Sequence, residues 1–173
     1  MNSPEAAYEQ HFDLVWRALR RLGVDEDSID DATQDVFLVV FRRWADFRGA
    51  SSLTTWIYGI LLRVASSYRR ARRRIPSTRD ENAAGALLDG RASPFEEASR
   101  REASRLLGQV LEVLEDHVRS LFVLVDLEEL TVQQAADLVG ISEPTARSRL
   151  RIARAHVNAN FSRLRARDVW RMG

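Results

Sequence analysis

Hydrophobic residues recur every three or four positions through the first 75 residues, the spacing of one face of an α-helix. The pattern predicts a first helix that starts near Ala6, ends at Gly23 and has an apolar face made of Tyr8, Phe12, Val15, Leu19 and Leu22. A second helix, capped by Asp27 or Ser28, is expected to run to about Asp46. After a short loop, a third helix is expected from about Leu53 to Arg74.

The same spacing predicts which faces of the second and third helices point into the core. The predicted inward residues of the second helix are Ile29, Ala32, Val36, Val39, Val40 and Trp44. A neighbouring set is the alternative, because this stretch is apolar on more than one face. The third helix is expected to turn Trp56, Ile60 and Val64 inward, with Tyr68 as a further candidate.

The periodicity fades between Pro76 and Pro94, where small, polar and glycine residues dominate. Such a composition is typical of a flexible linker, which we place at residues 76–95. Helical spacing then returns in two apolar stripes, made of Leu106, Leu107, Val110, Leu111 and Leu114 and of Leu121, Phe122, Leu124, Val125 and Leu127. Because strand-type alternation is absent, the predicted fold class is all-α, with two small helical domains at residues 1–75 and 96–173 joined by this linker.

The segment from Thr131 to Arg154 has the pattern of a helix-turn-helix. Thr131 and Gln134 form a capping box that opens its first helix. Gly140 stands where this helix must stop and the chain must turn, a position that favours glycine. Ser142 is a natural N-cap for the second helix. The predicted buried stripe of that second helix is Ala146, Leu150, Ala153 and Val157.

The charged residues are segregated along the chain, although the formal net charge is only +1. Residues 25–35 carry six acids and no base, whereas residues 63–79 carry seven arginines and no acid. The arginines of the second helix of the helix-turn-helix point away from its buried stripe and suit a DNA major groove and its phosphates; they are Arg147, Arg149, Arg151 and Arg154. An ordinary helical hairpin with solvated arginines is the alternative. Two separate basic blocks favour two contacts with one polyanion.

The composition excludes several classes of function. The chain has no cysteine, which rules out disulfides and thiolate metal sites, and its three histidines are scattered. With no catalytic cluster and no phosphate-cradling glycine loop, we expect neither an enzyme nor a cofactor or metal site. No apolar run is long enough to cross a membrane, and the N-terminus lacks the blocks of a signal peptide. We therefore expect a cytoplasmic protein without membrane insertion.

The two halves together resemble a family of bacterial RNA polymerase sigma factors, the small extracytoplasmic-function (ECF) type. The first half carries this resemblance at Asp31–Phe37 (DATQDVF), Phe47–Gly49 (FRG) and Ser51–Ile60 (SSLTTWIYGI). The second half carries it at Leu121–Leu124 (LFVL) and Ala136–Arg154. The motifs occur in the expected order, with a gap at the linker. The resemblance implies a region 2 domain, a region 4 domain and no catalytic site.

The resemblance also implies which surface docks on core RNA polymerase. Asp31, Gln34 and Asp35 match the acidic helix that contacts the clamp of the largest catalytic subunit. Carboxylates four residues apart share one helix face and can pair with arginines across an interface. A simple preference of acids for a helix N-terminus is the alternative for this cluster. Phe122 lies in a helix that resembles the one holding the polymerase flap tip, with plain core packing as its alternative.

Two groups of residues match the promoter contacts of the family. The predicted −10 contacts are Arg48, Ser51, Ser52 and Trp56 for the unstacked base and Arg63, Arg69, Arg70, Arg73 and Arg74 as a track for phosphates. Trp56 is either a stacking platform or a core residue. The predicted −35 contacts are Thr145, Arg147, Ser148 and Arg149 on bases or phosphates, with Arg151 and Arg154 on the backbone.

The sequence departs from the family pattern at a few positions. Arg63 and Ser67 stand where Asn and Asp are frequent, and Gly59 stands where Arg is frequent. Glu129 replaces a common glycine at a turn. The first three changes bear on the details of −10 recognition.

The partners implied by the resemblance are core RNA polymerase, promoter DNA and an anti-sigma factor that covers the polymerase-binding surfaces; no small-molecule substrate is expected. The main alternative is an autonomous helix-turn-helix repressor or activator, which predicts tight duplex binding by the protein alone. A sigma-like protein without promoter activity is a further variant.

Overall fold

The computed structural model describes residues 3–74 and 94–171, with side chains described for residues 3–74 and 102–163. In these residues every regular element is helical, which confirms the all-α prediction. The first domain comprises α1 (Pro4–Arg21), α2 (Glu26–Arg42), the 3₁₀ turn η1 (Trp44–Asp46) and α3 (Leu53–Arg74). The second comprises α4 (Pro94–Glu112), α5 (Asp116–Phe122), the π-helical turn η2 (Val123–Leu127), α6 (Val132–Val139) and α7 (Glu143–Arg171).

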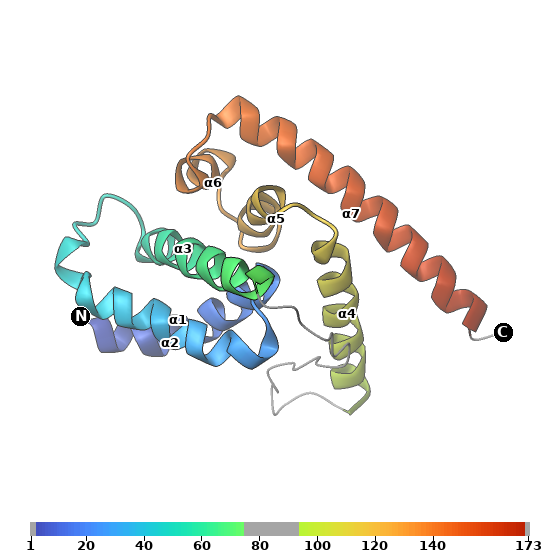
Figure 1. Cartoon of the computed structure of the whole chain (residues 1–173), viewed down its shortest axis with the longest axis horizontal. Helices are drawn as coiled ribbons and strands as arrows, with labels where there is room; N and C mark the ends of the chain where they lie inside the picture. Colours follow the sequence, from blue (N-terminus) through green and yellow to red (C-terminus); the bar gives the residue numbers. More distant parts are fainter. Residues whose placement is uncertain (1–2, 75–93, 172–173) are drawn as a thin grey trace.

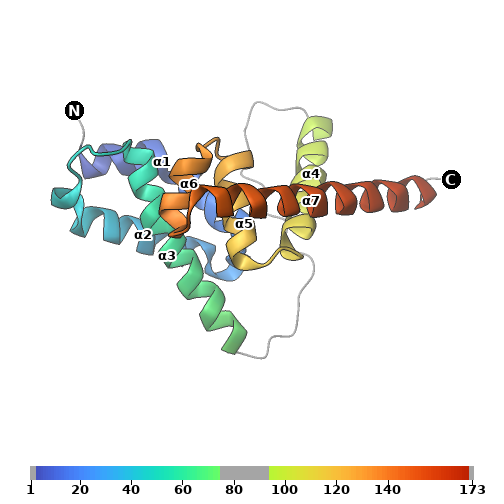
Figure 2. The same ribbon diagram turned by 90° about the horizontal axis from the view of Figure 1, so that it is seen from above.

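The predicted linker at residues 76–95 lies outside the described residues, apart from its last two positions, which begin α4. Helices α1, α2 and α3 pack on one another, while α4, α5 and α6 each pack against α7. Helix α7 runs past α4, and its C-terminal end projects away from the other helices (Figures 1 and 2). The first turn of α1 and the last turn of α7 lie at opposite ends of the long axis (Figure 1).

Helix α1 ends as its sequence predicts. Gly23 adopts a left-handed conformation with φ 85°, which favours glycine because it has no Cβ. At the other end, the Ser3 hydroxyl accepts a hydrogen bond from the Ala6 amide at 3.2 Å and caps the helix. Val15, Leu19 and Leu22 are fully buried, whereas Tyr8 is 41% exposed. The predicted apolar face therefore enters the core at its C-terminal end and reaches solvent at its N-terminal end.

Helix α2 differs from its prediction at both ends. It begins at Glu26, with Asp25 rather than Asp27 or Ser28 at the N-cap position, and the Asp25 carboxylate forms an ion pair with Arg72 of α3. The helix ends at Arg42 instead of continuing to Asp46, because the chain tightens into η1. The predicted residues Ile29, Ala32, Val36 and Val40 are buried, Val39 and Trp44 are half-buried, and Thr33 and Phe37 are buried in addition.

Helix α3 has the predicted bounds, but its inward face was only partly predicted. Ile60 is buried as expected, whereas Trp56, Val64 and Tyr68 are half-buried. The fully inward face is made of Ile57, Tyr58, Leu61 and Ala65. Helix α3 contacts α1 and α2 and also α6 of the second domain, so more than one face is covered. A single amphipathic stripe cannot describe a helix with partners on two sides.

The helix-turn-helix has the local geometry that its sequence predicts. The Thr131 hydroxyl accepts from the Gln134 amide at 3.2 Å, and the Gln134 side chain accepts from the Thr131 amide at 2.9 Å, which completes the capping box. Gly140 is left-handed with φ 77°. The Ile141 amide then donates to the Ala136 carbonyl at 3.0 Å and closes the turn. The predicted stripe of Ala146, Leu150, Ala153 and Val157 is buried.

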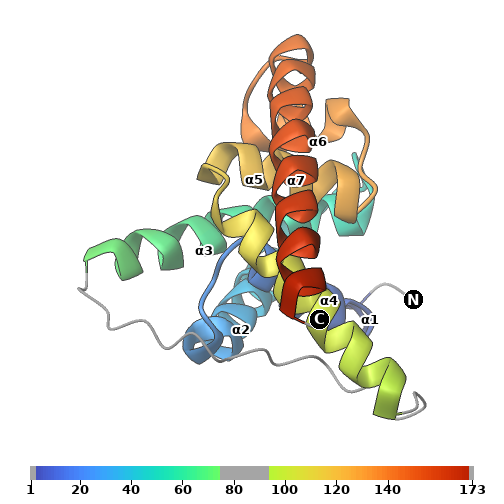
Figure 3. The same cartoon turned by 90° about the vertical axis from the view of Figure 1, so that its right-hand side faces the viewer.

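The turn between η2 and α6 takes an uncommon backbone course. The Glu128 amide donates to the Val123 carbonyl, five residues back, at 3.0 Å, which is the pattern of a π-helix. Glu129 follows with φ 58° and is the only non-glycine residue with positive φ among the described residues. This course turns the Glu128 side chain towards the first domain, where it meets α1 and α3. In two views at right angles, α6 lies over α3 (Figures 1 and 3).

Candidate nucleic-acid interface

Most of the predicted −35 contacts at the start of α7 are exposed. Thr145, Arg147, Ser148 and Arg151 are exposed and Arg149 is half-buried. Arg147 forms an ion pair with Glu143 one turn earlier. Further along, Arg154 Nε lies 2.9 Å from Asp126 Oδ1 of η2. No ion pair of Arg149 or Arg151 is present within the described residues, so among the four arginines predicted for the −35 element these two are the ones without a paired carboxylate.

The predicted phosphate track on α3 is only partly accessible. Arg63, Arg70, Arg73 and Arg74 are exposed, but Arg69 is buried. Arg69 Nη1 donates to the Leu22 carbonyl at 2.6 Å, and Arg73 Nη2 donates to Asp116 of α5 at 2.9 Å. Arg69 Nε also lies 3.3 Å from Asp116 Oδ2, so Arg69 is a buried interdomain contact in this structure rather than a surface cation. Its sequence position beside Arg70 gives no sign of this, because the partners come from α1 and α5.

The loop between η1 and α3 combines exposed polar residues with a small aromatic cluster. Arg48, Ser51 and Ser52 are exposed. The Ser52 hydroxyl accepts from the Thr55 amide at 3.0 Å and so caps α3. This capping role was missed from the sequence, although a serine just before a helix is its usual signal. The loop is therefore anchored at its C-terminal end.

Trp56 is neither fully buried, as a core residue would be, nor fully exposed, as a free stacking platform would be. Its ring is half-buried and packs at 5.4 Å from Phe47 and at 6.4 Å from Trp44, measured between ring centroids. The three rings brace the loop against α3. A half-buried ring at the base of an exposed loop can both support the loop and offer an edge to an unstacked base.

The predicted polymerase-docking residues lie on the exposed face of α2. Asp31, Gln34 and Asp35 are all exposed. Beside them is an open groove of about 510 Å³, lined by Tyr8, Phe12, Asp30, Gln34, Phe37 and Leu38. Leu38 is 42% exposed and Tyr8 41%. Exposed carboxylates close to a largely apolar groove suit a partner helix with both basic and apolar residues.

Phe122, by contrast, is only 7% exposed and belongs to the hydrophobic core. The structure therefore supports the core-packing alternative for its side chain. Helix α5 packs against both α6 and α7, which contribute to covering it. A sequence stripe cannot separate these two roles, because each requires an apolar side chain.

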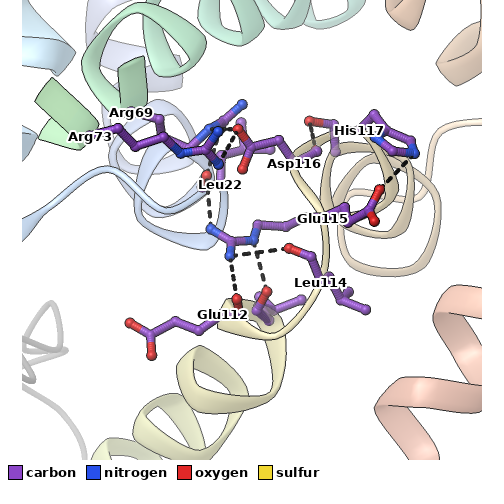
Figure 4. Close-up of polar contacts among 11 residues, drawn as sticks. Leu22, Arg69, Arg73, Glu112, Leu114, Glu115, Asp116 and His117 are labelled. Carbon is purple, nitrogen blue, oxygen red and sulfur yellow. Dashed lines mark hydrogen bonds and ion pairs between the residues drawn. The ribbon is translucent and has the colours of Figure 1, made fainter. Parts of the chain in front are cut away.

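A cluster of polar residues joins the two domains where α1 ends (Figure 4). Asp116 Oδ2 lies 3.3 Å from Arg69 Nε and 2.9 Å from Arg73 Nη2. Arg119 Nε donates to the Leu111 carbonyl at 2.8 Å, and Arg119 Nη1 approaches the Leu22 carbonyl at 3.5 Å. The two guanidinium groups thus meet the carbonyl ends of α1 and α4, which carry partial negative charge.

Burial has electrostatic consequences at this junction. It lowers the pKa of the Arg69 guanidinium from its ordinary value, and the charge of Asp116 acts in the opposite direction. Burial also lowers the pKa of Arg119, and the positive charge of Arg69 lowers it further. Both groups stay charged because arginine has a very high intrinsic pKa. The junction therefore concentrates two buried cations around one carboxylate and several backbone carbonyls.

A second polar contact joins the domains at Glu128. Its Oε1 accepts from Arg21 Nη1 at 2.6 Å and its Oε2 accepts from the Tyr58 hydroxyl at 2.6 Å. Burial, followed by this hydrogen bond, raises the pKa of Tyr58. Sequence analysis missed Arg21, Tyr58, Asp116, Arg119 and Glu128. The one available signal was Tyr58, a polar-tipped residue within an apolar helical stripe.

Comparison with known proteins identifies the family. A model of sigma-70 region 2 matches residues 7–75, and a model of sigma-70 region 4 matches residues 104–157. The RNA polymerase sigma factor YlaC of Bacillus subtilis is 26% identical over 96% of each chain. The ECF RNA polymerase sigma-E factor of Haemophilus influenzae is 29% identical over 76% of this chain and 73% of its own.

Solved structures show the same fold. The structure of CnrH in complex with the cytosolic domain of CnrY matches with a TM-score of 0.68 and 23% identity, over 92% of this chain and 87% of that chain. The sigma factor RpoE in complex with the anti-sigma factor NepR, from Bartonella quintana, matches with a TM-score of 0.65 and 22% identity, over 90% and 97%.

These matches define a transcription initiation factor. The chain belongs to the sigma-70 family and is an RNA polymerase sigma factor of the ECF type. Such a factor directs promoter-specific transcription initiation. The alternative of an autonomous helix-turn-helix repressor or activator is not favoured by these comparisons. No helix in the described part of the chain is long and apolar enough to span a membrane.

Proposed function

We propose that the exposed face of α2 is the surface that docks on core RNA polymerase. Asp31, Gln34 and Asp35 supply the polar contacts, and the adjacent groove accepts apolar side chains of the partner. The observation that carries this proposal is the combination of exposed carboxylates with exposed apolar residues on one surface. Charge pairing would select the partner and set the association rate, while the buried apolar contacts would supply affinity.

The first domain would bind the −10 element through the loop and α3. Arg48 and Ser51 are exposed at the loop and can bond an unstacked base, whereas Ser52 already caps α3. Arg63, Arg70 and Arg73 line the exposed side of α3 and can follow the phosphates. Arg69 would join this track only after it leaves the Leu22 carbonyl.

The second domain would bind the −35 element with the start of α7 in the major groove. Thr145, Ser148 and Arg149 would meet base edges or phosphates, as would Arg147 once it exchanges Glu143 for DNA. Arg151 and Arg154 would contact the DNA backbone. We place the functional division of the chain at residues 1–75, 76–95 and 96–173.

The remaining assignments follow from the family. The protein would act in the cytoplasm, where core polymerase and promoter DNA are found, and would have no enzymatic activity of its own. Both structural neighbours were solved as complexes: RpoE with the anti-sigma factor NepR, and CnrH with the cytosolic domain of CnrY. An anti-sigma factor that covers the exposed face of α2 would likewise keep this protein from core polymerase.

In vitro transcription with purified core polymerase and a pool of promoter fragments tests the proposal. We expect transcripts that require this protein and share one pair of −35 and −10 sequences. The double variant Gln34→Ala/Asp35→Ala should lose core binding and transcription while its circular dichroism spectrum stays unchanged.

Gln109→Ala/Glu112→Ala is the matched control, since it removes an exposed amide and an exposed carboxylate from α4. Full activity of the α2 double variant would contradict the docking assignment. Tight binding of the free protein to a duplex operator, without any core-dependent transcript, would support a repressor instead.

A further inference from the structure

The first turn of α3 is tied to α1 by a histidine that is not among the proposed promoter contacts. His11 Nε2 lies 3.2 Å from the hydroxyl oxygen of Thr54, a residue 43 positions further along the chain. His11 Nδ1 lies 3.1 Å from the Ala7 carbonyl, one turn earlier in α1. The side chains of His11 and Thr54 are half-buried. The start of α1 and the loop before α3 lie at the same end of the first domain (Figures 1 and 2).

The bonding partners of His11 determine which of its nitrogens carries the proton. A carbonyl oxygen can only accept, so Nδ1 donates to Ala7. In the neutral ring Nε2 is then the acceptor, and the Thr54 hydroxyl donates to it. Because both nitrogens are bonded, the ring is held in one orientation, and the Thr54 side chain is held with it.

Thr54 belongs to the turn in which the −10 loop ends and α3 begins. The Ser52 hydroxyl accepts from the Thr55 amide at 3.0 Å and lies 2.8 Å from the Thr55 hydroxyl. Thr54 lies between these two residues, so the bond to His11 connects the capped turn to α1. At its other end the loop begins with Phe47, which packs in the aromatic cluster described above. The loop is therefore anchored at both ends.

The tip of the loop is open to solvent between these anchors. Arg48 and Ser51 are exposed, and a Cβ at Gly49 would meet open space. The orientation of the tip therefore depends on the residues that anchor it. Side chains that recognise a ligand need such support, because a small displacement weakens the hydrogen bonds that select the correct partner.

We infer that His11 is a positioning residue for recognition of the −10 element. Its bond to Thr54 holds the first turn of α3, so that Arg48 and Ser51 meet the unstacked base in one orientation. This inference rests on the −10 contacts proposed above, and His11 acts through Thr54 without touching the DNA. A loop held in its binding orientation loses less conformational entropy when the base enters. It also discriminates between bases better than a loop that can adapt to several of them.

Binding of the reconstituted holoenzyme to two labelled single-stranded oligonucleotides tests the inference. One carries the −10 sequence of a promoter selected in the transcription assay, and the other carries the same bases in scrambled order. The dissociation constant for the scrambled strand divided by that for the −10 strand, both from fluorescence anisotropy, measures the −10 specificity. His11→Ala and Thr54→Val each remove one partner of the bond, whereas Thr54→Ser keeps the hydroxyl.

We expect His11→Ala and Thr54→Val each to lower the specificity ratio about fivefold, the effect of losing one hydrogen bond. The double variant His11→Ala/Thr54→Val should lose no more than either single variant, because both act through the same bond. Thr54→Ser should keep the ratio of the unsubstituted protein. An unchanged ratio in both single variants would overturn the inference, and so would additive losses in the double variant.

Thr33→Val is the matched control in the same domain. The Thr33 hydroxyl is buried and donates to the Ile29 carbonyl within α2 at 2.7 Å. The substitution therefore removes one hydrogen bond, as Thr54→Val does. We expect it to lower the free energy of unfolding, measured by urea unfolding, and to leave the specificity ratio unchanged. An equal fall of the ratio in Thr33→Val would show that lost stability lowers it, which would also overturn the positioning role.

A failure of the proposed −10 contacts would give a different result. If Arg48→Ala or Ser51→Ala lowers the specificity ratio and His11→Ala does not, the contacts stand and His11 has no positioning role. If neither Arg48→Ala nor Ser51→Ala lowers the ratio, the proposed contacts are wrong. The role inferred for His11 then falls with them, whatever effect His11→Ala has.

Discussion

The hydroxyl of Tyr68 donates a hydrogen bond to Oδ2 of Asp35 at 2.8 Å. This bond joins α3, which carries the proposed DNA track, to the exposed face of α2, which carries the proposed polymerase contacts. It leaves Oδ1 of Asp35 for an interface partner and restricts the rotamer of the carboxylate. A docking residue that is already oriented loses less conformational entropy on binding.

This bond predicts a pH dependence. Burial, followed by the hydrogen bond to Asp35, raises the pKa of Tyr68 from 10.0 to about 12. Because the pKa is higher in the folded state, the neutral phenol contributes its stabilisation fully below pH 10 and loses it between about pH 10 and pH 12. An ultraviolet absorbance titration should show one phenol that ionises near pH 12, and Tyr68→Phe should remove that step.

Asp35→Asn is the informative control for this titration. The amide still reaches the hydroxyl but carries no negative charge, so the pKa of Tyr68 should fall towards its ordinary value. A titration curve that is identical in the unsubstituted protein and in Tyr68→Phe would contradict the assignment.

The backbone conformation of Glu129 predicts that glycine at this position would stabilise the protein. Its φ of 58° is left-handed, which costs a residue with a Cβ roughly 1–2 kcal/mol relative to glycine. Glycine in turn loses more backbone entropy on folding, by about 0.5–1 kcal/mol. Glu129→Gly should therefore raise the free energy of unfolding by about 0.5–1 kcal/mol, measured by urea unfolding. Glu129→Ala keeps the Cβ and should bring no such gain.

Gly140 predicts the opposite effect in the helix-turn-helix. Its φ is 77°, and a Cβ there would meet open space, so the cost of a side chain is purely conformational. Gly140→Ala should lower the free energy of unfolding by about 1 kcal/mol, and Gly140→Asn by less, because asparagine tolerates this conformation. Equal unfolding midpoints for glycine and alanine would show that the turn adopts another conformation in solution.

The contrast between these two turns shows what sequence can predict. Gly140, Gly23 and the Thr131 capping box lie where the local backbone alone sets the requirement, and all three have the predicted geometry. The positive φ at Glu129 could not be predicted from its own side chain. The one sequence signal for this positive φ was that the family commonly has glycine at this position.

Tertiary contacts explain the larger differences. The Arg69 hydrogen bond reaches a carbonyl 47 residues earlier, and the Arg119 contact reaches the same carbonyl across 97 residues. Helical spacing placed Arg69 in a basic run, but the run does not show which arginine faces another domain. The same holds for Phe122, whose burial depends on how α6 and α7 cover α5.

The aromatic cluster predicts a role for Phe47. Its ring packs against both Trp44 and Trp56, and aromatic pairs contribute about 0.5–1.5 kcal/mol each. Phe47→Ala should lower the free energy of unfolding by about 1–3 kcal/mol and shift the tryptophan emission to longer wavelength. Phe47→Leu keeps most of the side-chain volume, so its free energy of unfolding should lie between those of the unsubstituted protein and Phe47→Ala. Unfolding curves followed by tryptophan emission and by circular dichroism measure both effects; an unchanged emission maximum in Phe47→Ala would contradict the cluster.

Two arginines of α7, Arg151 and Arg154, should contribute differently to promoter binding and to its dependence on salt concentration. Neutralising one phosphate contributes about 0.9 to the slope of log affinity against log salt concentration. Arg151 is exposed and has no ion pair within the described residues, so Arg151→Ala should lower the slope for promoter binding by about that amount.

Arg154 already pairs with Asp126 at 2.9 Å and must exchange this carboxylate for a phosphate. Arg154→Ala should therefore weaken binding less than Arg151→Ala does. Asp126→Asn, which frees Arg154, should strengthen binding at low salt, because the guanidinium then reaches the DNA without giving up a partner.

Binding of the reconstituted holoenzyme to one promoter fragment is measured at several salt concentrations. The series gives the affinity and the salt slope for the unsubstituted protein and for each variant. Arg163→Ala, an exposed arginine farther along α7, controls for the general effect of losing a positive charge. Equal slopes for Arg151→Ala and Arg163→Ala would show that Arg151 does not contact the DNA backbone. A larger loss in Arg154→Ala than in Arg151→Ala would show that the pair with Asp126 breaks at no cost when DNA binds.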